Sequence, residues 1–230
     1  MFIKPLAFLL SFALSACGAN VSADDFGAQY LGARYVNDPL GEGAGYDADP
    51  LIRTDAFDCL TYVETVMAGG DVDKLTQIRY ADGVAEFTHR NHFFTADWLK
   101  NNADLVENIG TDFGSTALHR GVIDKRTWFK TVHNMDVDVA PRAAEIEYVP
   151  YDKIETTDVT APTLVAFVVG ENSAGVLVSH VGFLLPGGVL RHASSARGAV
   201  VDMDFREYAA TRAKNKHNLG VAFFKIKETK

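Results

Sequence analysis

Two apolar segments separated by a glycine-rich turn limit what this chain can fold into more than any other part of its sequence. Residues 175–185 and 189–193 are rich in β-branched and apolar side chains, and Pro186-Gly187-Gly188 lies between them. This pattern predicts a β-hairpin, and a three-residue turn would place Leu185 opposite Val189. Further strands are predicted at residues 144–151, 163–169 and 220–226. The C-terminal half of the chain is therefore expected to form an antiparallel sheet.

A helix is predicted at residues 59–68, ahead of all these strands. Its apolar side chains recur at helical spacing, and Gly69-Gly70 follows it. Asp55 or Asp58 can cap its first turn. Two more helices are predicted at residues 95–106 and 126–132. A helix followed by antiparallel strands is typical of an α+β fold.

The first 16 residues resemble a bacterial export signal. A positive start, Met1 to Lys4, precedes an apolar stretch of about ten residues, which is too short to span a bilayer. The stretch ends in Leu14-Ser15-Ala16-Cys17, which resembles a lipobox and predicts a lipid anchor on Cys17. Gly18 follows, and by resemblance to bacterial lipoproteins this favours the outer membrane, facing the periplasm. The alternative is cleavage after Val21-Ser22-Ala23, which would release a soluble product.

The rest of the chain is predicted to consist of a tether and one folded domain. Residues 17–33 are small and polar, which is typical of a tether, and residues 34–230 have a length that suits a single domain. We expect a monomer.

The charge of the chain argues against nucleic acid as a partner. It has 30 acidic and 22 basic residues, a net charge of −8, and no run of Lys or Arg. No cofactor is predicted, because Gly41-Glu42-Gly43 lacks the following helix that a phosphate-binding loop needs. No metal site is predicted either: His89 and His92 are three residues apart, but no HExxH or paired-cysteine pattern accompanies them.

The cysteine content singles out Cys59. The chain has two cysteines, and Cys17 is assigned to the lipid. An unpaired thiol is unusual in an oxidising compartment, although a lone Cys is more often a small buried hydrophobe. At the start of a helix, the backbone N–H groups and the helix dipole are expected to lower the pKa of the thiol. The same N–H groups can stabilise an oxyanion, so Cys59 is the candidate nucleophile.

Two histidines on the predicted hairpin are the candidate partners of Cys59. With a three-residue turn, His180 lies opposite Ser194, and His192 lies diagonally beside His180 on the same face. One imidazole could then act as the base and the other could orient it. A two-residue turn would shift the register and separate them. Either His taken alone is more often a packed or surface residue.

Three short segments together resemble a superfamily of cell-wall hydrolases. The cysteine motif of NlpC/p60 peptidases is similar to Phe57-Asp58-Cys59-Leu60-Thr61-Tyr62-Val63. Their histidine motif is similar to Ser179-His180-Val181-Gly182-Phe183. The place of their third polar residue is similar to Leu190-Arg191-His192-Ala193-Ser194. Within the superfamily, the closer resemblance is to the N-acetylmuramoyl-L-alanine amidase-like family. It rests on Asn37-Asp38-Pro39-Leu40-Gly41-Glu42-Gly43, the Thr-Tyr-Val-Glu after Cys59, and Arg90-Asn91-His92-Phe93-Phe94 leading to Asp97-Trp98. The resemblance extends over most of residues 35–208, through which these segments are distributed.

This resemblance implies a papain-like NlpC/p60 fold, in which the helix that begins with Cys59 packs on the antiparallel sheet. It also implies a Cys/His/His amidase that cleaves the N-acetylmuramoyl to L-alanine amide of peptidoglycan fragments (muropeptides) through an acyl-enzyme. His180 lies 121 positions after Cys59, farther than in compact members, so residues 71–160 are expected to add helices and strands around the site.

Within the added segment, Arg90, His92 and Trp98 are expected to line the substrate cleft, because Arg suits carboxylates and Trp suits sugar rings. A core Trp98 and a solvated Arg90 are the alternative.

Two other functions compete with the amidase. A γ-D-glutamyl-diamino-acid endopeptidase would use the same Cys59, His180 and His192. A non-catalytic lipoprotein that binds muropeptides is the other alternative, but a binder has no need of all three residues.

Overall fold

The computed structural model describes residues 25–170 and 175–227. The predicted export signal of residues 1–16 and the predicted lipid anchor at Cys17 lie outside these residues. The helices are α1 (Cys59–Met67), α2 (Val72–Arg79), α3 (Leu99–Asn101), α4 (Lys125–His133) and α5 (Phe205–Ala213). The strands are β1 (Arg34–Tyr35), β2 (Ala56–Phe57), β3 (Val106–Asn108), β4 (Ala117–Ile123), β5 (Arg142–Pro150), β6 (Thr163–Val169), β7 (Val178–Leu185), β8 (Val189–Ser194), β9 (Ala199–Asp204) and β10 (Asn218–Ile226). None of the helices in the described part of the chain is long and apolar enough to cross a membrane.

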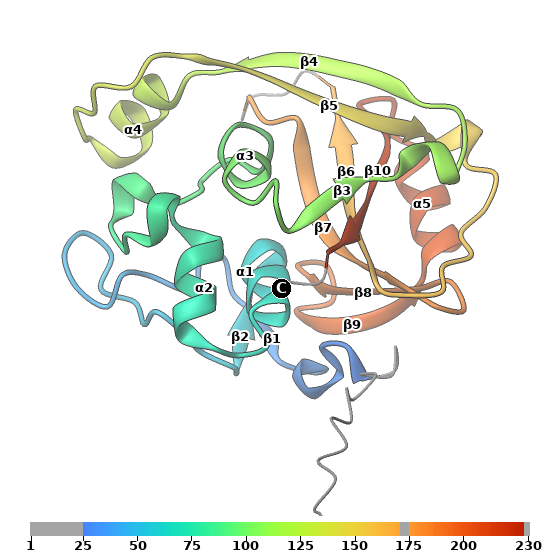
Figure 1. Ribbon diagram of the computed structural model, residues 1–230, viewed down its shortest axis with the longest axis horizontal. Helices are drawn as coiled ribbons and strands as arrows, with labels where there is room; N and C mark the ends of the chain where they lie inside the picture. Colours follow the sequence, from blue (N-terminus) through green and yellow to red (C-terminus); the bar gives the residue numbers. More distant parts are fainter. Residues whose placement is uncertain (1–24, 171–174, 228–230) are drawn as a thin grey trace, which may run out of the picture.

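The strands of the described residues form one 10-stranded sheet. Its order is β2-β1-β9-β8-β7-β6-β10-β5-β4, and β3 pairs with β10 beside this path. In Figure 1, β4 and β5 arch over one end of the molecule while β8 and β9 lie at the other, so the sheet is strongly curled. The neighbouring strands pair antiparallel, except for the short parallel pair of β1 and β2. The predicted α+β class is confirmed.

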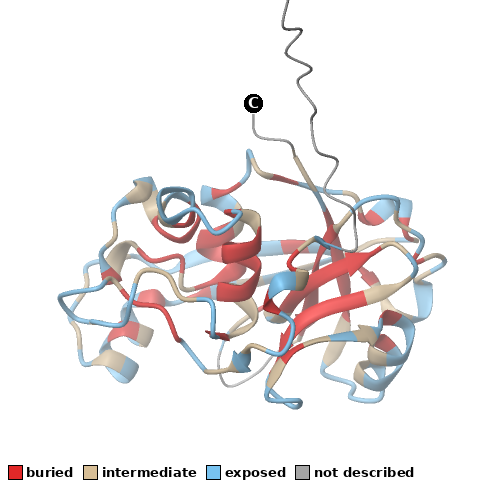
Figure 2. Ribbon diagram, turned by 90° about the horizontal axis from the view of Figure 1, so that it is seen from below, coloured by how far each residue is buried: buried red, intermediate tan, exposed pale blue. Residues whose placement is uncertain are grey.

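Strand β6 lies at the centre of the fold, because both of its faces are buried. Leu164 and Ala166 belong to the larger core cluster, which also contains the apolar face of α1. Val165 and Phe167 belong to a second cluster, which contains α5. Figure 2 shows the central strands and the helix beside them in the colour of buried residues. The helices α1 and α5 therefore cover opposite faces of this strand.

Helix α1 begins where its capping residue fixes the chain. The Asp58 Oδ1 atom accepts a hydrogen bond from the Thr61 backbone N at 2.8 Å, and the Thr61 Oγ1 atom accepts one from the Asp58 backbone N at 2.9 Å. This reciprocal capping box satisfies N–H groups that a helix start leaves without partners. Of the two caps expected from the sequence, Asp58 is the one used, and Cys59 becomes the first residue of the helix.

The β7–β8 hairpin has the predicted register. Leu185 pairs with Val189, and Phe183 pairs with Arg191. The turn depends on Gly187 and Gly188, whose φ angles of 82° and 76° lie in the left-handed region that side chains disfavour. The turn length therefore fixes which residues of the two strands meet.

On its other edge β7 carries a bulge at Ser179. His180 pairs with Phe167 of β6, but the next residue of β6, Val168, pairs with Val178. Ser179 is thus an extra residue opposite its partner strand. A bulge re-aims the side chains around it, and bulges are common beside functional sites.

Residues 25–33 belong to the folded domain, which corrects the predicted boundary at residue 34. Tyr30 lies in a short helix, Ala28–Tyr30, and is 7% exposed. The ring of Phe26 meets that of Phe183 edge-on at 4.9 Å between centroids. Most other residues of this segment are small or polar, and for that reason the sequence predicts a tether.

The middle of the chain builds the extra helices and strands that were expected. Helix α4 and strands β5, β6 and β10 match their predicted positions closely. The helix predicted at residues 95–106 is wrong in length: a π-helix at Phe94–Trp98 and the short α3 are followed by β3. Strands β4 and β9 and helix α5 were not predicted from the sequence.

Substitution of Gly182 tests how closely β7 and β8 approach. A Cβ atom at this position would lie 2.8 Å from the Cβ of His192 and 3.0 Å from the Arg191 carbonyl oxygen. We expect Gly182→Ala to lower the free energy of unfolding by about 1–3 kcal/mol, measured by urea denaturation. Gly170→Ala is the control, because its nearest contact would be 3.6 Å from the Cβ. Equal stability of the two variants would contradict the close approach.

Candidate active site

Cys59 shares a small cavity with a histidine of the hairpin. The cavity has a volume of about 140 Å³, and α1, β7 and residues 92–95 supply much of its wall. Cys59 and His180 both line it, together with His92 and Ser179. The structure therefore brings the candidate nucleophile and the candidate base, 121 positions apart in the chain, into one pocket.

The thiol is protonated in this environment. Burial, and to a lesser degree the nearby Asp58 carboxylate, raises the pKa of Cys59 to about 12. The backbone N–H groups of Val181, Cys59 and Leu60 oppose this by lowering the pKa. The expectation of a lowered pKa at the helix start is therefore wrong for this structure, since desolvation outweighs the helix terminus.

The two hairpin histidines form a direct pair, as the register predicted. The Nε2 atom of His180 lies 2.6 Å from the Nδ1 atom of His192, and their rings are 4.8 Å apart at 81°. Gly182 faces His192 across the hairpin and leaves the room that a side chain would fill. Burial lowers the pKa of His180 well below its usual value and that of His192 to about 4. Both rings are therefore neutral at neutral pH.

Met203 of β9 settles which nitrogen of each ring carries the proton. Its Sδ atom lies 3.4 Å from the Nε2 atom of His192. A thioether sulfur can only accept, so His192 Nε2–H is the donor and its Nδ1 atom is bare. That Nδ1 atom then accepts from Nε2–H of His180. The lone pair of neutral His180 is consequently on its Nδ1 atom, away from His192.

Helix α5 contributes two residues near the pair that the sequence analysis missed. The ring of Tyr208 lies 5.1 Å from that of His192 and 6.0 Å from that of His180. The positive charge of Arg212 contributes to lowering the pKa of both histidines. The sequence signal for α5 is weak, because its apolar residues do not follow a helical stripe, and only the Asp204 cap marks its start.

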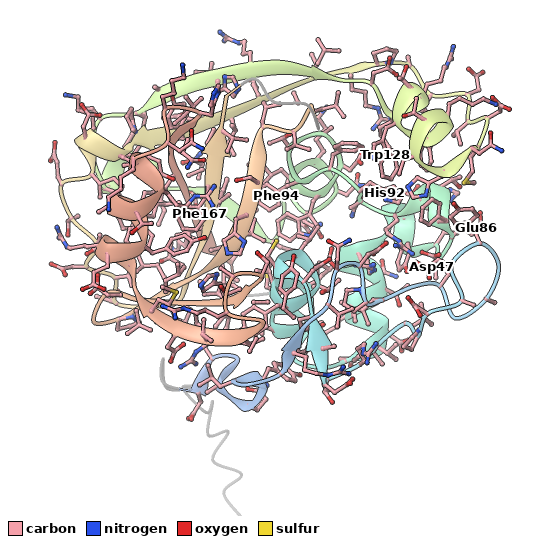
Figure 3. The ribbon with its side chains drawn as sticks, turned by 180° about the vertical axis from the view of Figure 1, so that it is seen from behind. Asp47, Glu86, His92, Phe94, Trp128 and Phe167 are labelled. Atoms are coloured by element: carbon pink, nitrogen blue, oxygen red, sulfur yellow. The ribbon has the colours of Figure 1, made fainter. Side chains whose placement is uncertain are left out.

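Of the three residues expected to line the cleft, only His92 does so. Its Nε2–H group donates to the Phe87 carbonyl oxygen at 2.7 Å, and burial lowers the pKa of His92 to about 2. Its ring lies 4.7 Å from that of Trp128, and Figure 3 shows the two side by side. His92 therefore forms one wall of the cavity as a neutral ring.

Trp98 and Arg90 have structural positions, which corrects the expectation for both. Trp98 is fully buried and stacks on Phe94 at 5.1 Å between ring centroids. Arg90 is 5% exposed and binds the carboxylates of Asp38, Glu42 and Asp47. The core alternative for Trp98 was right, whereas Arg90 is neither in the cleft nor solvated.

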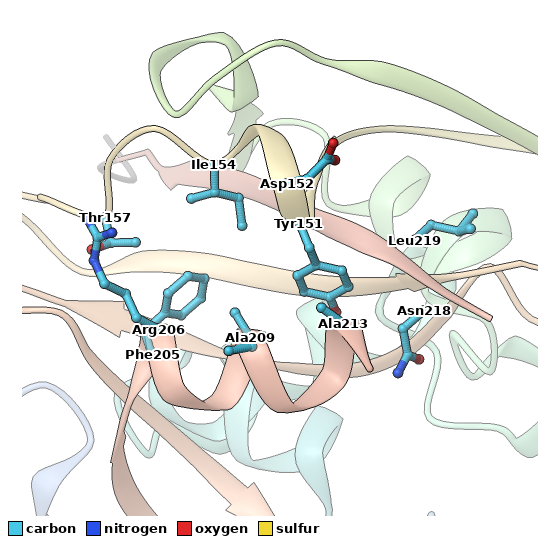
Figure 4. Close-up of a pocket in the computed structure, with 11 residues that line it drawn as sticks. Tyr151, Asp152, Ile154, Thr157, Phe205, Arg206, Ala209, Ala213, Asn218 and Leu219 are labelled. Carbon is cyan, nitrogen blue, oxygen red and sulfur yellow. The ribbon is translucent and has the colours of Figure 1, made fainter. Parts of the chain in front are cut away.

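A larger cavity of about 470 Å³ lies between α5 and the segment around Tyr151, as Figure 4 shows. Its walls contain Ala209 and Ala213 but no Cys or His. Within residues 25–170 and 175–227 there is also no group of three or more His, Cys, Asp or Glu that could hold a metal ion.

Comparison with known proteins agrees with the motifs in the sequence. The model of the N-acetylmuramoyl-L-alanine amidase-like family matches residues 25–216. Because this match covers most of the chain, the protein belongs to that family. Membership supports a hydrolase that acts on peptidoglycan. No curated protein matches the chain.

Solved structures of low sequence identity share the fold. A protein of Legionella pneumophila superposes with a TM-score of 0.80 at 20% identity, over 90% of this chain and 88% of the other. An N-acetylmuramoyl-L-alanine amidase from Bacteroides uniformis superposes with a TM-score of 0.69 at 23% identity, over 90% and 98%. The architecture, including the segment between Cys59 and His180, is thus common to these proteins.

The charge of Asp58 should control the reactivity of Cys59. Asp58→Asn keeps a capping side chain but removes the carboxylate that raises the pKa of the thiol. More thiolate should then be present at any pH below that pKa, and the rate of alkylation by iodoacetamide at pH 8 should rise roughly two- to tenfold. Asp71→Asn, at the exposed cap of α2, is the control and should change nothing. An unchanged rate in a folded Asp58→Asn protein would contradict the assigned cause.

Proposed function

We propose that this protein is a cysteine amidase that cleaves the N-acetylmuramoyl to L-alanine amide of peptidoglycan fragments. One observation carries the proposal: Cys59 and His180 line one cavity, and His192 lies 2.6 Å from His180 on its other side. Family membership supports the substrate class. A papain-like arrangement of the NlpC/p60 type is part of this proposal, with α1 packed against β7 and β8.

In the first step, Cys59 attacks the amide carbonyl. The thiol is neutral at rest, so its proton passes to His180 Nδ1 as the C–S bond forms, and a preformed thiolate is not required. The carbonyl oxygen becomes an oxyanion, which backbone N–H groups at the start of α1 can stabilise. The proton on His180 then passes to the leaving amine of L-alanine, and an acyl-enzyme with the lactyl group of the sugar remains.

In the second step, His180 takes a proton from water while the water oxygen attacks the acyl carbon. The C–S bond breaks, and the thiol recovers its proton from His180. His192 acts through His180: its bare Nδ1 atom accepts from Nε2–H of His180 and stabilises the charged ring in both steps. Met203 holds His192 in the tautomer that this requires.

Two other functions compete with the amidase. A γ-D-glutamyl-diamino-acid endopeptidase would use the same residues, and the fragments released from a defined muropeptide would distinguish it by mass spectrometry. A non-catalytic binder is disfavoured by the union of Cys59, His180 and His192 in one site.

We further propose that a lipid on Cys17 anchors the protein to the outer membrane, facing the periplasm.

Single variants should separate the roles of the three residues. Cys59→Ala should abolish hydrolysis, and His180→Ala should lower kcat/KM by roughly 10²–10⁴-fold, because it removes the base. His192→Ala should cost less, and His192→Asn should recover part of the loss, because an amide oxygen can still accept from His180. His217→Ala, an exposed His outside the cavity, is the control.

The double variant of His180 and His192 tests whether the two residues act together. If the two residues act as one unit, its kcat/KM should match that of His180→Ala. Additive losses, or a His192→Ala variant weaker than His180→Ala, would overturn the assigned roles. More than a few per cent of activity in Cys59→Ala would overturn the nucleophile.

The proposed anchor has its own test. Cys17→Ala should move the protein from the membrane fraction to the soluble periplasm, because a lipidated cysteine is the anchor. Ser22→Ala, in the segment after the proposed cleavage site, is the control and should stay with the membrane. Unchanged fractionation of Cys17→Ala would exclude a lipid on this residue.

A further inference from the structure

Arg212 of α5 lies at the edge of the candidate active site. Its guanidinium carbon is 5.2 Å from the ring centre of Phe167, and that ring is 5.7 Å from the ring of His180. Its Nη2 atom donates to the Ser179 Oγ atom at 2.6 Å and to the Asn218 Oδ1 atom at 3.3 Å. Arg212 is therefore fixed beside the catalytic histidine by neutral groups.

No carboxylate in the described residues neutralises this cation. The buried arginines of the described residues all have one: Arg79 binds Glu64 at 2.9 Å, Arg90 binds three carboxylates, and Arg191 binds Asp202 at 2.7 Å. Arg212 is half-buried, and its Nε atom is sealed from solvent with no hydrogen-bond partner within residues 25–170 and 175–227. Burying a charge without a counter-ion is costly, and this chain has an excess of acidic residues to supply one.

The bulge in β7 connects Arg212 to the cavity. In a regular strand, Ser179 and His180 would point to opposite faces. Because Ser179 is the extra residue of the bulge, it can lie on the side of α5, where Arg212 binds it, and it also lines the cavity with Cys59. Its oxygen accepts from Arg212, so its own hydroxyl proton can be donated to a ligand in the cavity. An exposed donor is thus backed by a positive charge at the rim of the pocket.

We propose that Ser179 and Arg212 form a binding subsite for a carboxylate of the substrate. The proposal rests on the proposed function, because muropeptide stems carry free carboxylates close to the amide that is cut. A carboxylate at the rim would accept from the Ser179 hydroxyl and supply the missing counter-charge for Arg212. Charge-assisted hydrogen bonds of this kind are about twice as strong as neutral ones. The subsite would fix the stem peptide while the scissile carbonyl lies at Cys59.

A purely structural role for Arg212 predicts a different response to ligand charge. If Arg212 only ties α5 to Ser179 and Asn218, its loss should weaken the binding of every ligand equally. If it binds a carboxylate, its loss should affect only ligands that carry one. Ligand charge therefore separates the two roles, even when a variant is somewhat less stable.

The test compares two ligands that differ only in charge. One is a defined muropeptide with free stem carboxylates, and the other has those groups converted to carboxamides. Binding is measured by calorimetry in the Cys59→Ala background, which prevents turnover. We expect Arg212→Gln to weaken binding of the acid at least about tenfold and to leave binding of the amide within about twofold. Arg212→Lys, which keeps the charge, should lose less.

A matched variant and a milder one complete the design. Arg206→Gln, on the same helix but bonded to Thr157, should leave the binding of both ligands unchanged. Ser179→Ala keeps Arg212 and its bond to Asn218, so it decides the matter if Arg212→Gln does not fold. Ser179→Ala should weaken binding of the acid several-fold more than binding of the amide. Equal losses for both ligands, or no loss for the acid, would overturn the subsite.

Failure of the subsite and failure of the proposed amidase give different results. Selective binding of the acid without any turnover by the wild-type protein would refute the amidase and leave the subsite. Turnover with equal KM for both ligands would support the amidase and refute the subsite.

Discussion

The position of Cys59 depends on the side chain of Asp58. Its carboxylate caps α1 by accepting from Thr61, and its other oxygen accepts from the Asp38 backbone N at 3.2 Å. One residue therefore sets where the helix begins and attaches the preceding loop to that point. The same negative charge raises the pKa of the neighbouring thiol. Burial, the larger cause, and the charge of this cap together keep the proposed nucleophile protonated, which makes proton transfer to His180 part of the proposed reaction.

A buried ionic cluster holds the loop of residues 38–47 against this helix start. Arg79 donates to Glu64 and to the Leu40 carbonyl oxygen, while Arg90 binds Asp38, Glu42 and Asp47. Removing one member would leave the others as unpaired buried charges, which typically costs about 3–5 kcal/mol. The family motif in this loop is consequently explained by architecture. Arg212 differs from these arginines in lacking a carboxylate partner within the described residues, and the proposed carboxylate subsite rests partly on that contrast.

The turn of the β7–β8 hairpin determines which residues of the candidate site meet. Two glycines with left-handed backbones fix its length, the length fixes the register, and the register places His180 and His192 on one face. Gly182 then leaves room for the two rings to meet. In a regular strand, Ser179 and His180 would point to opposite faces of the sheet. The bulge at Ser179 allows both residues to lie near α5. These are local features with consequences for a site formed by distant segments.

The sequence by itself determined features that depend on near neighbours: a helix beginning at Cys59 with Asp55 or Asp58 as its cap, the β7–β8 hairpin, and the meeting of His180 with His192 if the turn has three residues. Its motifs also indicated the family. Only the tertiary structure decided what depends on burial and on distant contacts. Desolvation reversed the pKa shift expected for Cys59, because burial outweighs the helix terminus. Packing placed Trp98 in the core and Arg90 among carboxylates of the protein, although Trp suits the sugar rings and Arg the carboxylates of a substrate. The folded sheet brought α5 to the histidines, and with it Tyr208 and Arg212, for which the sequence pattern carries no signal because their partners lie in β6, β7 and β8.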